Sequence, residues 1–153
     1  MQSSFNTGSY TFGNGSFTVE AWIYPQAAGA AAVRTIAAKY HTNPSGEIGG
    51  FHLYLNAAGQ LEFKVGDAPV APMTPPGRQG IIRTAAAITF NAWTHVAAVR
   101  AGNNPTGWTL YVNGIAVPTV IVNGAIMPTG IIEQGSPDQL YVGGGAAAGA
   151  PNS

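Results

Sequence analysis

Hydrophobic and polar residues alternate with a period of two along much of the chain. Residues 16–24 show this pattern first, and such alternation places one set of side chains on each face of a strand. Pro25 ends the segment. Residues 50–56 and 60–66 repeat the alternation on either side of a short Ala-Ala-Gly sequence, which predicts a hairpin whose turn uses Gly59 in a left-handed conformation.

Turn signals separate several further short strands. The same pattern predicts strands over residues 33–40, 84–90, 94–100, 108–112, 115–117, 119–122, 125–127 and 140–142. Asn-Gly pairs at 113–114 and 123–124 predict tight hairpin turns, because both residues tolerate positive φ. Residues 67–80 carry four prolines and are expected to form a loop. Since no stretch shows a helical period with caps, the chain is predicted to be an all-β, antiparallel two-sheet β-sandwich.

Several segments of the chain resemble laminin G-like domains of the concanavalin A-like jelly-roll superfamily. They occur in the family's order and comprise Ser16–Pro25, Ile36–Tyr40, Gly50–Leu55, Asn91–Ala97, Trp108–Gly114 and Leu140–Gly144. The resemblance implies a concanavalin A-like jelly roll over residues 1–145. Residues 146–153 are rich in Gly and Ala and are expected to form a tail.

Both ends of the chain depart from that family. The residues before Ser16 offer little of the family's usual first strand. After Gly144 the sequence lacks the family's closing strand with its acidic, apolar, Arg and aromatic pattern. Weak terminal strands would leave backbone groups unpaired at a sheet edge. The sequence therefore predicts that a neighbouring subunit, a partner or a rerouted terminus covers this edge.

Charge is scarce, and this narrows the choice of partners. Only 8% of the 153 residues are charged, with six Lys+Arg balancing six Asp+Glu, whereas soluble domains average about 25%. A chain with zero net charge lacks the excess of positive charge that binding to nucleic acid or to an anionic membrane requires. No apolar run is long enough to span a bilayer. Zero net charge favours self-association. The absence of Cys excludes disulfides and thiolate sites.

The carboxylates are too dispersed for catalysis. Related folds include glycosidases, which need two carboxylates flanking the scissile bond. None of the six carboxylates here is paired at i, i+2 spacing, so no catalytic residue and no enzymatic activity are predicted. Calcium is common in the family that the chain resembles. Asp67 and Asp138 are weak candidate ligands for it, because Ca²⁺ usually takes several carboxylates. No other cofactor is expected.

Three residues are candidates for ligand binding. Tyr54 and Tyr111 lie opposite the apolar face of their strands, where they could contact a glycan, and Glu20 shares a face with Trp22 and Tyr24. For Glu20, a structural role in hydrogen bonding is the favoured alternative. Trp93 and Trp108 are expected to pack in the core, since they fall on apolar alternations, and His95 is expected to be structural.

The function predicted first is assembly. The N-terminus has no basic segment followed by an apolar one, so no signal peptide is visible on a domain type normally found outside cells. Together with the weak terminal strands, this predicts a non-catalytic virion component of phage type, such as a capsid decoration (cement) or tail protein. It would act on a virion or extracellular surface, as a homo-oligomer or with other virion proteins. The alternative is a lectin-like carbohydrate-binding module, with or without calcium.

Overall fold

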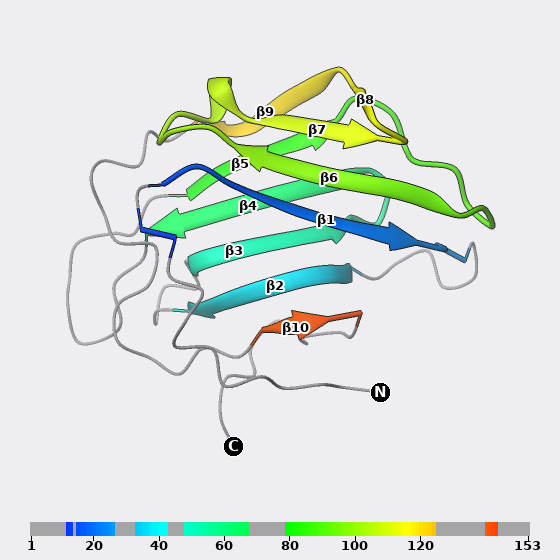
Figure 1. Cartoon of the computed structure of the whole chain (residues 1–153), viewed down its shortest axis with the longest axis horizontal. Coiled ribbons are helices and arrows are strands. Elements are labelled where there is room, and N and C mark those ends of the chain that lie inside the picture. The colour runs from blue at the N-terminus through cyan, green and yellow to red at the C-terminus, as the bar shows by residue number, and fades with distance from the viewer. Residues whose placement is uncertain are drawn as a thin grey trace.

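Two antiparallel sheets pack face to face in the computed structural model, which describes residues 12–13, 15–26, 33–42, 48–67, 79–124 and 140–143. One sheet has four strands in the order β1-β6-β7-β8. The other has six in the order β10-β2-β3-β4-β5-β9. Figure 1 shows β1, β6 and β7 lying in front of the larger sheet. The predicted all-β jelly-roll sandwich is confirmed.

The strands are short, as the frequent turn signals predict. Their bounds are β1 Phe17–Ile23, β2 Arg34–Thr42, β3 Ile48–Leu55, β4 Leu61–Asp67, β5 Gln79–Thr84, β6 Thr94–Arg100, β7 Thr109–Val112, β8 Ile115–Ala116, β9 Thr119–Gly124 and β10 Tyr141–Val142. One 3₁₀ turn, Pro105–Gly107, precedes β7. No helix among these described residues is long and apolar enough to cross a membrane.

Alternate residues of the central strands fill the space between the sheets. The fully buried part of this core comes from both sheets and includes Leu53, Leu61, Phe63, Val65, Ile82, Val96, Ala98 and Leu110. Because a strand turns successive side chains to opposite faces, the residues between these positions point out of the sandwich. The period of two seen in the sequence therefore sets which side chains form the outer surfaces.

Two of the three turns that the sequence predicts with positive φ are present. Gly59 has φ +76° in the turn between β3 and β4. Asn113 and Gly114 have φ +50° and +78°, and they join β7 to β8. Positive φ at both central residues is what a type I′ turn requires.

Two element predictions are wrong. The first concerns the strand expected over residues 84–90. The observed strand, β5, begins at Gln79, inside the segment expected to be a loop, and ends at Thr84. The Thr84 hydroxyl accepts a hydrogen bond from the Leu61 amide (3.1 Å) and donates one to the Ala86 carbonyl (2.6 Å). Hydrogen bonds of this side chain therefore take the place of backbone pairing between strands at the end of β5.

The second error concerns the Asn-Gly pair at 123–124, which lies within β9. Asn123 and Gly124 pair with Ile81 and Gly80 of β5. The strand predicted over 125–127 lies outside the described residues, as do the residues before Phe12 and the 146–153 tail.

Candidate functional site

The outward side of the six-stranded sheet carries polar and aromatic side chains across four neighbouring strands. Cross-strand pairs His52↔Lys64, Tyr54↔Glu62 and Glu62↔Arg83 place these residues on the side opposite the core. We call this surface the polar face and define it by Thr35, Tyr40, His52, Tyr54, Glu62, Lys64 and Arg83. It contains Tyr54, one of the three residues that the sequence singled out.

Glu62 is the centre of a hydrogen-bonded network on the polar face. Its carboxylate accepts hydrogen bonds from the Tyr54 hydroxyl and from Asn56 Nδ2 at 2.8 Å. The guanidinium of Arg83 lies 3.9 Å away. Because Glu62 is only 8% exposed, it acts mainly by holding Tyr54 and Arg83 in place. The partly exposed groups of Tyr54 and Arg83 are then preorganised at the surface.

Three rings form a row beside this network. The ring centroid of His52 lies 5.3 Å from that of Tyr40 and 4.4 Å from that of Tyr54. His52 Nε2 and Thr35 Oγ1 are hydrogen-bonded at 2.9 Å. Burial and the hydrogen bond to Glu62 raise the pKa of Tyr54, so its hydroxyl remains a donor at neutral pH. The row combines apolar ring surface with fixed polar atoms, which is the composition of a site for a polar small molecule.

The central ring of the row is uncharged at neutral pH. Burial and the nearby charge of Lys64 lower the pKa of His52 to about 4. An unfolded chain would protonate His52 near its ordinary pKa of about 6.5. Between these two values the unfolded state binds a proton that the folded state does not, so stability must fall as the pH decreases through this window.

We expect the free energy of unfolding to decrease by about 2 kcal/mol more in the wild type than in His52→Phe between pH 7 and pH 5. Urea unfolding at the two pH values measures this difference. His52→Phe loses the hydrogen bond with Thr35 at both pH values, so this loss cancels when the two pH values are compared. All other titrating groups are common to the two proteins and cancel in the same way. Equal losses in the two proteins would show that His52 titrates normally in the folded state.

The other two candidate residues lie on the opposite side of the sandwich. Glu20 and Tyr111 point outward from the four-stranded sheet, so the structure separates them from Tyr54. The carboxylate of Glu20 is 3.7 Å from His95 Nε2, and its side chain is 68% exposed. The role of Glu20 stays a prediction.

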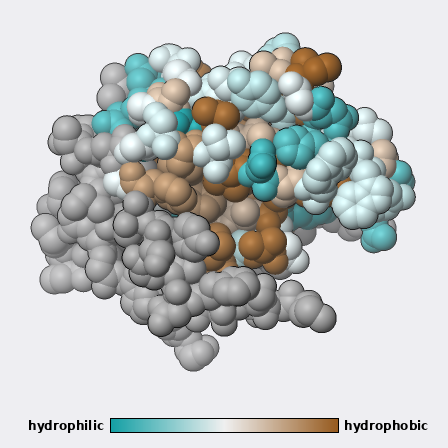
Figure 2. Space-filling model, in the orientation of Figure 1, coloured by the Kyte–Doolittle hydropathy of each residue, from teal (hydrophilic) through white to brown (hydrophobic). Residues whose placement is uncertain are grey.

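The same sheet exposes a group of aromatic side chains that we call the aromatic face: Trp22, Tyr24, Trp93 and His95. Trp22 and Trp93 are each 66% exposed. Their rings contact those of His95 and Tyr24, at 5.4 and 5.7 Å respectively. The four-stranded sheet faces the viewer in Figure 2, where hydrophilic and hydrophobic patches are mixed.

The prediction that Trp93 packs in the core is therefore wrong, whereas Trp108, at 4% exposure, is buried as predicted. The physical reason is that β6 is apolar on both of its faces. Val96 and Ala98 face the core, which turns Trp93, His95 and Ala97 outward. Alternation alone did not identify which of two apolar sets points inward.

Calcium binding stays a prediction. Asp67 is the last residue of β4, and Asp138 lies outside the described residues. Within the described part of the chain, no group of three or more His, Asp or Glu side chains is placed to hold a metal ion.

Sequence reasoning missed the partners that complete the polar face. Glu62 and Lys64 lie on the same face of their strand, and the predicted hairpin places that face beside Tyr54. Their position next to Tyr54 could therefore have been predicted from the sequence. Arg83 could not be identified from the sequence in this way. Its place beside Glu62 depends on the register between β4 and β5, and the sequence predicted a loop where β5 begins.

Fold and surface together define a concanavalin A-like β-sandwich with a polar, ring-lined sheet face. The chain belongs to the concanavalin A-like lectin/glucanases superfamily, since the laminin G-like family model of that superfamily matches residues 2–151. The family resemblance seen in the sequence is thus confirmed. Comparison with curated proteins gave no match.

Several solved structures are similar to this chain. They include the CBM40 of the Ruminococcus gnavus IT-sialidase bound to α2,3-sialyllactose (15% identity, TM-score 0.57) and the CBM40 of the same sialidase (14% identity, TM-score 0.56). Both alignments cover 97% of this chain and 77% of the other. At this identity the similarity shows a shared fold.

Proposed function

We propose that this protein is a non-catalytic glycan-binding module and that the polar face is its sugar-binding surface. The observation that carries the proposal is the row of Tyr40, His52 and Tyr54 rings beside the Glu62 network. Sugars present both apolar C–H surfaces and hydroxyl groups. The half-buried rings of Tyr40 and Tyr54, with fixed donors and acceptors beside them, are complementary to both.

We further propose that the sugar is acidic. Arg83 lies on the polar face beside Glu62, whose buried carboxylate already accepts hydrogen bonds. The Arg83 side chain is 38% exposed and that of Glu62 only 10%, so the guanidinium is the more accessible charge of the pair and would attract a sugar carboxylate. The similarity to modules solved with sialyllactose makes sialylated oligosaccharides the first ligands to test.

Isothermal titration with 3′-sialyllactose, 6′-sialyllactose and lactose tests both steps. We expect binding of at least one sialyllactose, with lactose binding more weakly. Tyr54→Ala should weaken binding by about tenfold or more, as for a residue central to a contact surface. Arg83→Ala should weaken sialyllactose binding more than lactose binding. Repeating the titration with EDTA tests the predicted role of calcium.

Matched controls lie on the opposite sheet. Tyr111→Ala and Glu20→Gln should leave the affinity within about twofold, because both residues are on the other side of the sandwich. Loss of binding in Trp93→Ala but not in Tyr54→Ala would assign the sugar to the aromatic face. Absence of binding to every oligosaccharide in a broad glycan array would reject the proposed function.

The similarity to CBM40 modules supports carbohydrate binding better than it supports a virion component, the function predicted first from the sequence. Assembly with virion proteins, homo-oligomerisation and a virion or extracellular location remain predictions. They are compatible with glycan binding, because a surface-displayed protein can also attach to glycans.

A further inference from the structure

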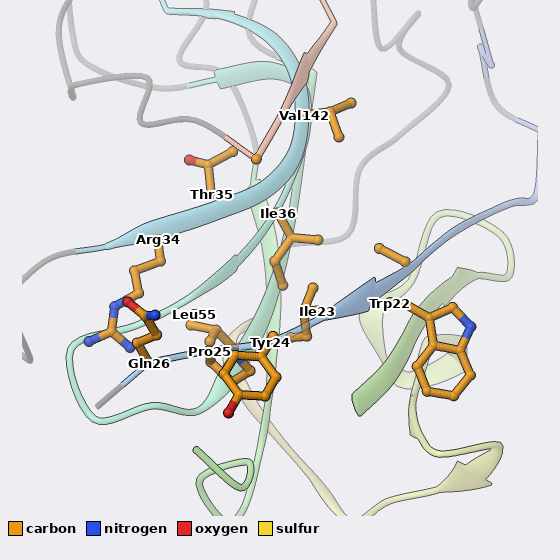
Figure 3. Close-up of a pocket in the computed structure, with 12 residues that line it drawn as sticks. Trp22, Ile23, Tyr24, Pro25, Gln26, Arg34, Thr35, Ile36, Leu55 and Val142 are labelled. Carbon is orange, nitrogen blue, oxygen red and sulfur yellow. The ribbon is translucent and has the colours of Figure 1, made fainter. Parts of the chain in front are cut away.

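A pocket of about 410 Å³ opens between the edge strand of the four-stranded sheet and the β2–β10 edge of the larger sheet. Its walls are mostly apolar and include Ile23, Pro25, Ile36, Leu55 and Val142. Figure 3 shows Ile23 and Ile36 on facing strands, and Figure 2 shows hydrophobic surface just below the four-stranded sheet. The volume is within the range of about 300–1,000 Å³ that small-molecule sites occupy.

Arg34 adds a positive charge to this apolar pocket. Its guanidinium lies over the ring of Phe90, with 5.3 Å from Cζ to the ring centroid. Nη1 of Arg34 is buried and has no hydrogen-bond partner among the described residues. A buried donor without an acceptor is costly to the folded state. An anionic oxygen at the wall formed by Arg34 would offset that cost with a charge-assisted hydrogen bond.

We propose that this pocket binds a small organic carboxylate with an apolar body. The carboxylate pairs with Arg34 at the end of the pocket that also holds Gln26, and the apolar body lies between Ile23 and Ile36 (Figure 3). The site is separate from the Tyr54 and Glu62 network, although Thr35 of the polar face also lines the pocket. Ile36 and Leu55 belong to the core side of the larger sheet, whereas Tyr54 and Glu62 point away from it.

Octanoate and its neutral analogue octanamide are the probes. Chemical-shift titrations of the ¹⁵N-labelled protein should show octanoate binding, with shifts concentrated at β1, the start of β2 and β10. Arg34→Gln should weaken octanoate binding by about tenfold and change octanamide binding by less than twofold, since the lost interaction requires charge. Arg34→Lys should retain most of the affinity for octanoate.

A second variant tests the position of the apolar body without altering Arg34. Val142 is 52% exposed on β10, so Val142→Trp can fill the pocket from its rim and should abolish octanoate binding. Val122→Trp, at a similarly exposed valine of the distant edge strand β9, is the matched control and should bind octanoate normally. The proposal is overturned if millimolar octanoate causes no shifts, or if Arg34→Gln or Val142→Trp binds it like the wild type. Sugar binding at the polar face is measured separately by the sialyllactose titrations, so failure of the octanoate experiment would not count against the proposed function.

Discussion

Replacing Arg100 with Ala is expected to lower the free energy of unfolding by about 4 kcal/mol, a large effect for one substitution. Arg100 is fully buried at the end of β6. Its Nη1 donates to the Gly15 carbonyl and its Nη2 to Asn103 Oδ1, both at 2.7 Å, and its guanidinium lies 5.9 Å from the Phe17 ring centroid. The substitution removes two charge-assisted hydrogen bonds that hold the chain at Gly15 and Asn103, and it leaves a cavity where the buried Arg100 side chain packs.

Arg100→Met separates these two effects. Methionine keeps much of the apolar stem that packs against Phe17 but makes no hydrogen bond, so its expected cost is smaller, about 2 kcal/mol. Burial lowers the pKa of Arg100, which means that removing this cation also relieves a desolvation cost. That relief is why the expected loss for Met stays below the full value of two charged hydrogen bonds.

Chemical denaturation at neutral pH measures both variants. Arg83→Ala is the control, because the Arg83 side chain is 38% exposed and its ion pair with Glu62 should contribute about 1 kcal/mol or less. If Arg100→Ala lost no more stability than Arg83→Ala, the bonds from Arg100 to Gly15 and Asn103 would contribute little.

The fold was largely predictable from the sequence because alternation and turn chemistry are local signals. The β3–β4 hairpin and the Asn113-Gly114 turn need only neighbouring residues to be recognised. Errors arose where a long-range contact decided the outcome. Thr84 ends β5 through its contacts with Leu61 and Ala86, and Leu61 is 23 residues away in the chain.

The candidate site was predictable only in part, for the same reason. Tyr54 could be selected as an outward-facing tyrosine of a hairpin. Tyr111 and Glu20 satisfied the same local criterion, yet they lie on the other sheet. Local alternation assigns a face of a strand but does not say which sheet that strand joins. The pairing of Glu62 with Arg83 follows from sheet order, which is a property of the whole fold.

Gly50→Ala should have an effect at least as large as the loss of Arg100, with about 4 kcal/mol or more lost or no folded protein recovered. Gly50 pairs with Tyr40 of β2, and its φ of +127° is a conformation that residues with a side chain rarely adopt. A Cβ there would overlap the carbonyl oxygen of Lys39 and lie 2.9 Å from the Tyr40 Cα. Both are backbone atoms of the paired strand, so relief requires β2 and β3 to separate.

Gly102→Ala is the matched control for Gly50→Ala. Gly102 also has positive φ, at +70°, but an added Cβ would meet nothing within 4 Å, so only the backbone strain of about 1 kcal/mol applies. Urea unfolding of the two variants measures the difference, which isolates the steric overlap. Because Tyr40 and His52 meet across the same strand pair, Gly50→Ala should also weaken sialyllactose binding if it folds. Equal stability of the two variants would mean that β2 and β3 tolerate a side chain at position 50, and that the close approach of these strands does not hold the polar face in place.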